Sequence, residues 1–131
     1  MLPIIFCPEK AQLQDNLNEV KRYLAYPKSA QLDKETEELI FQTIELSKNN
    51  LNPKSVYQTF PLEIQEDKIS FANTTIHSKN LTVNLANCKK ITLMAATIGI
   101  RFDNLLKRIQ LENPAQAAIL QACGAMYTEE L

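Results

Sequence analysis

Glycine, histidine and tryptophan are scarce in this chain of 131 residues, which contains two glycines, one histidine and no tryptophan. Gly99 and Gly124 lie far apart, which excludes a glycine-rich loop that surrounds a phosphate group. The three cysteines, Cys7, Cys88 and Cys123, are also far apart, so neither a Cys-x-x-Cys motif nor a disulfide framework is indicated. Because free cysteine packs as a small hydrophobic residue, we expect three reduced and largely buried thiols.

The chain also lacks an excess of charge of one sign, since 14 basic residues stand against 15 acidic ones. No basic stripe with interleaved aromatic residues is present, which argues against a nucleic-acid partner. The longest apolar run, around Leu93, is well short of the ~20 residues that span a bilayer. The first six residues lack the basic segment and cleavage site of a signal peptide. We therefore expect a cytoplasmic protein without a membrane partner.

The length and the hydrophobic content of 45% are sufficient for one core, so we expect a single domain over residues 1–131. No internal repeat or low-complexity linker is present. Segments with helical periodicity and segments with strand alternation do not follow a regular strand–helix–strand order. This arrangement predicts an α+β fold in which helices pack on a small, mostly antiparallel sheet, with a long buried helix at the C-terminus.

Two helices are predicted in the first half of the chain. Apolar residues spaced by three and four predict the first helix, which ends near Tyr26 and Pro27: Leu13, Leu17, Val20 and Leu24. Asp33 is a candidate N-cap of the second helix, and acidic residues follow it in the first turn, as the helix macrodipole favours. This helix runs to about residues 49–50, because Pro53 prevents its continuation.

Strand patterns follow. Apolar and polar residues alternate over 56–65, which predicts a strand with one buried face, and Pro61 favours an edge strand or a bulge. A turn at 66–68 leads to a return strand at 69–71, and 73–76 add a short third strand. The segment 78–88 fits either a strand or a helix, and Ser78 as an N-cap together with the exit at Asn87 favours a short helix.

The last forty or so residues predict a buried strand, a tight turn and two helices. The strand covers 91–98, Gly99 permits the turn, and an amphipathic helix begins at Ile100. Asn113 and Pro114 open a second helix that runs to the end of the given sequence. This helix has almost no polar face before Glu129 and is therefore expected to be buried. Gly124 within it predicts that another element approaches very closely.

Residues with catalytic chemistry are few. His77 is the only histidine, and no local signature links it to a cysteine nucleophile. The acidic groups at 35–38 and 63–67 have the composition of solvated faces. Arg101, Lys107 and Arg108 form either an anion contact or the wet face of a helix. An enzyme that uses Cys88 or His77 is one hypothesis for this chain.

Several stretches together resemble the activation-domain family of cobalamin-dependent methionine synthase, and in particular its free-standing members. The resemblance is carried by residues 94–99 (Met-Ala-Ala-Thr-Ile-Gly), 102–106 (Phe-Asp-Asn-Leu-Leu) and 113–125 (Asn-Pro-Ala-Gln-Ala-Ala-Ile-Leu-Gln-Ala-Cys-Gly-Ala). Residues 56–62 and 78–88 fit the same relatives in order and spacing. The resemblance covers roughly residues 33–131, and more weakly 17–26.

This resemblance implies a domain that binds S-adenosylmethionine and presents it to an oxidised corrinoid, within methionine biosynthesis. The cobalamin would be carried by a partner protein or domain, and reductive methylation with an electron from a flavodoxin-like donor would restore methylcobalamin. In this reading the chain supplies orientation, while the cofactors supply the difficult chemistry.

The resemblance also implies site residues. Glu129 matches a glutamate beside S-adenosylmethionine, or is simply the first polar residue where a buried helix reaches solvent. Thr97 and Gly99 match the turn after the strand, where they either shape the fold or touch the ligand. Ala25 stands where methionine synthase has an aspartate that contacts the ligand. The family's Arg-Pro-x-Pro-Gly-Tyr motif would follow Leu131, so we expect a domain that is incomplete at its C-terminus.

A third hypothesis is a non-catalytic interaction module that kept the scaffold and lost the ligand site, which Ala25 and the missing motif favour. Independently of these hypotheses, the apolar C-terminal helix is a candidate surface for a homo-oligomer.

Overall fold

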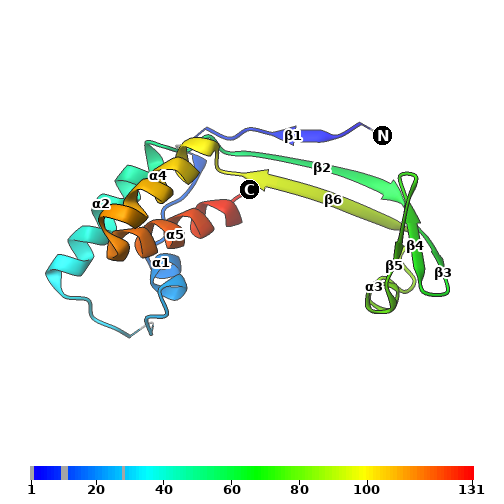
Figure 1. Ribbon diagram of the computed structural model, residues 1–131, viewed down its shortest axis with the longest axis horizontal. Coiled ribbons are helices and arrows are strands. Elements are labelled where there is room, and N and C mark those ends of the chain that lie inside the picture. The colour runs from blue at the N-terminus through cyan, green and yellow to red at the C-terminus, as the bar shows by residue number, and fades with distance from the viewer. Residues whose placement is uncertain (1, 10–11, 28) are drawn as a thin grey trace. The chain divides into compact units, whose positions relative to one another are not determined.

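The computed structural model describes residues 2–9, 12–27 and 29–131, and its order of elements is shown in Figure 1. The predicted α+β class is confirmed. The chain divides into two compact units, one made of the residues up to Ile5 with Val56–Ala95, and the other of Phe6–Ser55 with Ala96–Leu131. The first unit holds most of the strands and the second holds four helices of the described chain.

The helical unit is organised around its last helix. Helix α5 (Pro114–Glu129) contacts α1 (Leu17–Tyr23), α2 (Lys34–Lys48) and α4 (Ile100–Glu112), and Figure 1 shows it in orange and red among them. The prediction of a long, buried C-terminal helix is therefore confirmed. The side chains that these helices bury together form one cluster, which includes Val20, Ile40, Ile44, Phe102, Leu105, Leu120 and Tyr127.

Local sequence explains how α5 begins and why it contains a glycine. Oδ1 of Asn113 accepts a hydrogen bond from the backbone N–H of Gln116 at 3.1 Å, and Pro114 occupies the first turn. A Cβ at Gly124 would lie 2.9 Å from Cε1 of Phe102 on α4. The predicted close approach of another element at Gly124 is thus confirmed.

The predicted start of the first helix was wrong. Helix α1 begins at Leu17, because Oδ1 of Asn16 accepts hydrogen bonds from the N–H groups of Asn18 and Glu19, at 3.1 and 3.3 Å. Leu13 precedes the helix but is still buried in the core. Helix α2 follows Asp33 as predicted and ends before Asn49, although the Asp33 side chain makes no capping hydrogen bond.

The strands form two antiparallel sheets of three strands each in the described chain. One has the order β1 (Ile4–Phe6), β2 (Lys54–Pro61) and β6 (Lys90–Thr97). The other has the order β3 (Glu63–Gln65), β4 (Lys68–Phe71) and β5 (Thr74–His77), so the predicted turn and return strands are confirmed. Ile64, Ile69 and Ile76 are aligned across it, and Ile69 is fully buried.

The single strand predicted over 56–65 was wrong in two respects. The chain leaves one sheet at Pro61 and enters the other at Glu63, with buried Leu62 between them. β2 is also the middle strand of its sheet, where Pro61 is tolerated because it is the last residue of the strand.

The ambiguous segment after β5 is a helix, as favoured above. α3 (Lys79–Asn84) begins after Ser78, whose Oγ accepts a hydrogen bond from the N–H of Leu81 at 3.2 Å. Asn87, beyond its end, has a φ of 67°, a conformation that asparagine tolerates better than most residues. α3 packs on β4.

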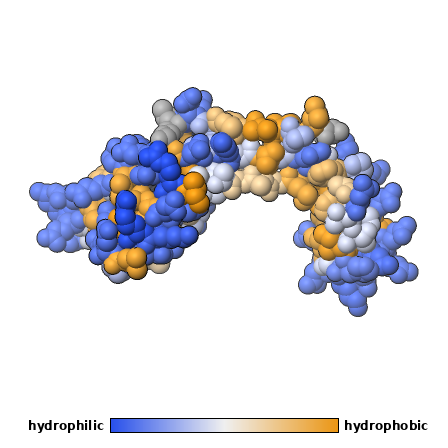
Figure 2. Space-filling view, turned by 45° about the horizontal axis from the view of Figure 1, so that its top comes forward, coloured by the Kyte–Doolittle hydropathy of each residue, from blue (hydrophilic) through white to orange (hydrophobic). Residues whose placement is uncertain are grey.

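Two predictions of burial were wrong. β6 was expected to be a buried strand, but Leu93 is 45% exposed and Met94 is 59% exposed. Figure 2 shows hydrophobic residues, in orange, on the surface of the strand region. Of the cysteines, only Cys123 is buried, while Cys7 and Cys88 are exposed. Ile100 also faces solvent, since the apolar face of α4 begins at Phe102.

Candidate functional site

The end of α1 has a well-defined backbone geometry. The N–H of Ala25 donates to the carbonyl of Arg22 at 3.0 Å, and the N–H of Tyr26 donates to the carbonyl of Lys21 at 2.9 Å. This pair of bonds is the Schellman motif, which places one residue in the left-handed conformation. That residue is Ala25, with a φ of 63°. Asparagine and aspartate adopt this conformation more readily than alanine does.

This helix end brings Arg22 and Tyr23 to Glu129 at the end of α5. Oε1 of Glu129 accepts a hydrogen bond from Nη2 of Arg22 at 3.2 Å and another from the hydroxyl of Tyr23. The guanidinium of Arg22 also donates twice to Oε2 of Glu19, at 2.7 and 3.1 Å. The structure thus joins Glu129 to 17–26, two segments that the resemblance had singled out separately.

The electrostatics of this corner are those of a compact charge network at the surface. The hydrogen bond to Glu129 raises the pKa of the Tyr23 hydroxyl, and the hydrogen bonds to Glu19 and Tyr23 raise the pKa of Arg22. The guanidinium carbon of Arg22 lies 4.5 Å from the centroid of the Tyr23 ring, within the range of a cation–π contact. The side chain of Glu129 is 49% exposed, so its carboxylate is accessible to a ligand.

A second cluster of polar side chains lies close to this corner in the helical unit. The hydroxyl of Tyr127, which is fully buried, donates to Oδ1 of Asp15 at 2.7 Å. Lys48 forms an ion pair with Oδ2 of Asp15, and this hydrogen bond raises the pKa of Lys48. Burial, together with the bond to Asp15, raises the pKa of Tyr127. These contacts join α2 and α5 to the segment before α1. Because Tyr127 precedes Glu129 by two residues, they also fix the part of α5 that carries Glu129.

A cavity of about 260 Å³ adjoins the same end of α1. Leu24 and Tyr26 of the α1 end face Ala115, Ala118 and other residues of α2 and α5 across it. Glu129 is not among the residues that line this cavity. The cavity therefore offers mainly apolar contacts beside Ala25, while the charges lie at the Glu129 corner.

The other two site residues predicted from the resemblance form a turn between β6 and α4. Gly99 has a φ of 102°, and its N–H donates to Oγ1 of Thr97 at 3.0 Å. A Cβ at Gly99 would lie 2.9 Å from Cβ of Asn52. This turn takes no part in the hydrogen bonds that hold Glu129. A ligand contact of Thr97 or Gly99 stays a prediction.

The remaining chemistry-bearing residues are dispersed. His77 and Cys88 are both exposed, and Arg101, Lys107 and Arg108 lie on the exposed side of α4. Within residues 2–9, 12–27 and 29–131, no group of three or more histidine, cysteine, aspartate or glutamate residues is placed to hold a metal ion. In the same residues, no helix has the length and apolar character needed to cross a bilayer.

Comparison with known proteins supports the resemblance at the level of fold. The sequence matches no family model and no curated protein. Among solved structures, the chain is similar to a crystal structure of the MetH reactivation domain bound to AdoHcy, with a TM-score of 0.65 and 13% sequence identity. The match covers 98% of this chain and 52% of the other, so the chain spans about half the length of that structure.

Sequence reasoning missed the partners of Glu129 and the whole Asp15 cluster. Their residues are spread over more than a hundred positions, and no spacing rule connects them. The only available signal was the resemblance of 17–26, which pointed to the segment but not to the contacts of Arg22 and Tyr23.

Proposed function

We propose that this chain is a reactivation-type component of a corrinoid methyltransferase system, and that it binds S-adenosylmethionine at the corner where the ends of α1 and α5 meet. The carrying observation is that Arg22 and Tyr23 converge on Glu129. The similarity of the fold to the MetH reactivation domain supports the same reading. The corrinoid would be held by a partner protein or domain.

The residues of the corner fit the chemistry of this ligand. The amine and the ribose hydroxyls of S-adenosylmethionine are donors, and the half-exposed carboxylate of Glu129 is an acceptor for charge-assisted hydrogen bonds. Arg22 and Tyr23 already donate to the same oxygen, so Oε2 of Glu129 is the oxygen that a ligand would engage first. The apolar cavity beside Ala25 gives room for an uncharged part of the ligand.

The chain's contribution would be positioning. S-adenosylmethionine supplies the methyl group when bound, and the corner would hold it at the surface, where a partner can approach. Exposure of Glu129, Arg22 and Tyr23 fits such a handover, because a deeply enclosed ligand could not meet a cofactor carried by another protein.

Calorimetric titration with S-adenosylmethionine tests this proposal. The Glu129→Gln variant keeps the shape of the side chain and removes its charge, and we expect its affinity to fall on the order of tenfold. The Ala25→Asp variant restores the carboxylate that the resemblance places there, and its φ of 63° suits aspartate. We expect Ala25→Asp to bind more tightly, and Ala25→Asn to serve as the uncharged control with the same backbone preference.

An interaction module without a ligand is the second candidate. It is favoured by Ala25, which lacks a carboxylate, and by the hydrogen bonds that already engage Glu129. This alternative predicts no heat of binding with either the wild-type chain or Ala25→Asp, together with retained association with a corrinoid protein. Binding by the wild-type chain that Glu129→Gln does not weaken would contradict the proposed site.

A further inference from the structure

The outer edge of β6 is an unprotected sheet edge. β6 stands at the end of the order β1-β2-β6 in the part of the chain that the structure describes. Its segment 92–97 (Thr-Leu-Met-Ala-Ala-Thr) contains no charge, no proline and no glycine. Natural edge strands usually carry charged residues or proline, which prevent pairing with another chain. The free edge can therefore accept a further strand.

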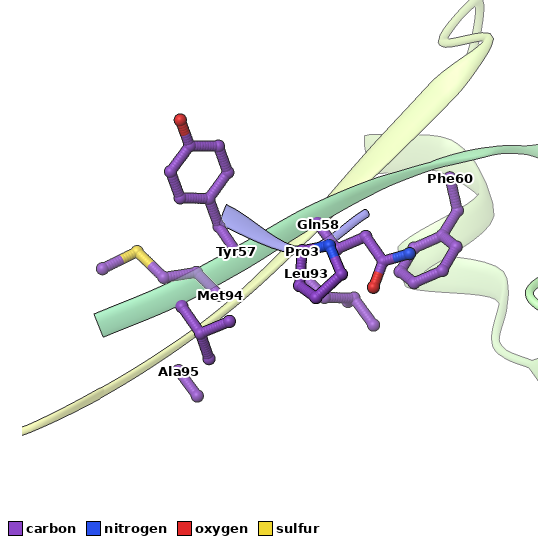
Figure 3. Close-up of a pocket in the computed structure, with 8 residues that line it drawn as sticks. Pro3, Tyr57, Gln58, Phe60, Leu93, Met94 and Ala95 are labelled. Carbon is purple, nitrogen blue, oxygen red and sulfur yellow. The ribbon is translucent and has the colours of Figure 1, made fainter. Parts of the chain in front are cut away.

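Exposed apolar side chains lie on β6 and on the adjoining strand. Leu93 and Met94 are 45% and 59% exposed, and Tyr57 on the adjoining strand β2 is 41% exposed. Together with Val56 and Phe60 they line an apolar recess of about 270 Å³ (Figure 3). The hydroxyls of Thr59 and Thr92 lie 2.8 Å apart and join β2 to β6 beside this recess. Burial of this surface would add a hydrophobic contribution to strand pairing.

We propose that β6 pairs antiparallel with β6 of a second copy of this chain, about a two-fold axis at Leu93, to form a continuous six-stranded sheet. The axis is perpendicular to the sheet, so the apolar recess of each copy lies on the same face of the joined sheet. An isologous arrangement of this kind closes as a dimer.

The charges and sizes along the strand favour a second copy as the occupant. The basic residues Lys89 and Lys90 lie at one end of β6, and the antiparallel register places Lys90 opposite Ala96 of the other copy. Like charges are thereby kept apart, whereas parallel pairing would set them side by side. In the same register Ile91 lies opposite Ala95, which matches a large side chain with a small one.

The net charge of the chain and the burial of α5 are both consistent with self-association through the edge of β6. The net charge of -1 gives little repulsion between two copies. The apolar helix that the sequence suggested for self-association is buried by α1, α2 and α4, so α5 does not offer its apolar residues to a second copy. The edge of β6, in contrast, exposes the apolar side chains of Leu93 and Met94.

A charge-exchange experiment tests the two-fold at Leu93. In this register Leu93 of one copy lies directly opposite Leu93 of the other, so Leu93→Lys sets two cations face to face, and Leu93→Glu sets two anions face to face. We expect the wild-type chain to dimerise in sedimentation velocity in the micromolar range. Each single variant should lose affinity on the order of tenfold or more, and an equal mixture of the two should regain it.

Leu111→Lys is the matched control, because Leu111 is 90% exposed on α4 and belongs to no part of β6, so its replacement should leave the dimer unchanged. Circular dichroism would establish that the Leu93 variants are folded. A wild-type chain that remains monomeric would overturn the proposal. A mixture of folded Leu93→Lys and Leu93→Glu chains that stays monomeric would also overturn it.

Discussion

The hydroxyl of Tyr127 donates a hydrogen bond to Oδ1 of Asp15 across a separation of 112 residues. Tyr127 lies on α5, and Asp15 immediately precedes the capping residue of α1. Lys48 of α2 pairs with the other oxygen of Asp15. One carboxylate therefore joins three segments of the helical unit, close to the corner at which Glu129 meets Arg22 and Tyr23.

Tyr127→Phe should destabilise the fold by about 1 to 2 kcal/mol, because it removes a hydrogen bond to a charged group and leaves the ring packing intact. Urea unfolding followed by circular dichroism measures this loss. Tyr57→Phe, at an exposed position, is the control and should change little. Asp15→Ala combined with Tyr127→Phe should cost less than the sum of the single changes, since both remove the same bond. Strict additivity would contradict the coupling.

Gly124→Ala should destabilise the protein, although alanine favours a helix by about 1 kcal/mol over glycine. The added methyl would lie 2.9 Å from the ring of Phe102, and overpacking of this kind costs about 1 to 3 kcal/mol. Thermal and urea unfolding measure the net effect. In a Phe102→Leu background the ring is removed, and the same Gly124→Ala change should be neutral or stabilising. A stabilising effect in the wild-type background would contradict the close packing.

Gly99→Ala should cost about 2 kcal/mol or more, because it combines an unfavourable φ of 102° with a clash at Cβ of Asn52. Thr97→Val removes only the oxygen that accepts the Gly99 N–H, and should cost about 1 kcal/mol. Unfolding curves of both variants, measured with and without S-adenosylmethionine, separate a structural role from a ligand contact. A Gly99→Ala chain of normal stability that had lost ligand binding would refute the structural role.

Stability should fall at alkaline pH. Burial raises the pKa of the Cys123 thiol from 9.0 to about 11, so the unfolded chain releases this proton before the folded chain does. The contribution is complete below pH 9.0 and decreases as the pH rises to about 11, by about 2 to 3 kcal/mol in total. The raised pKa of Tyr127 has the same sign and adds to the loss above its ordinary value of 10.0.

Urea unfolding at several pH values between about pH 8 and about pH 11 measures this dependence. Cys123→Ala should flatten the first part of the decline, and Tyr127→Phe should flatten the part at higher pH. Cys88→Ala is the control, because Cys88 is exposed. An unchanged pH profile for Cys123→Ala would contradict the assignment to this thiol.

Structural features that depend on neighbouring residues in the sequence were predicted well. The exit into α5 at Asn113 and Pro114, the cap of α3 at Ser78 and the turn at Gly99 follow from the conformational preferences of single residues and from hydrogen bonds between near neighbours. The start of α1 was misplaced because the apolar spacing extends to Leu13, whereas the capping amide of Asn16 fixes the helix start.

The sequence by itself determined the local elements, their order, and the burial of α5, because an apolar helix has no polar side to turn to solvent. Only the tertiary structure decided that β6 lies exposed at a sheet edge, that Tyr127 reaches Asp15, and that Glu129 meets the end of α1. The apolar sequence of β6 is the same whether or not another layer of the protein covers the strand, so the sequence does not reveal its exposure. Contacts between residues a hundred positions apart depend on how helices pack, and no spacing in the sequence records that packing.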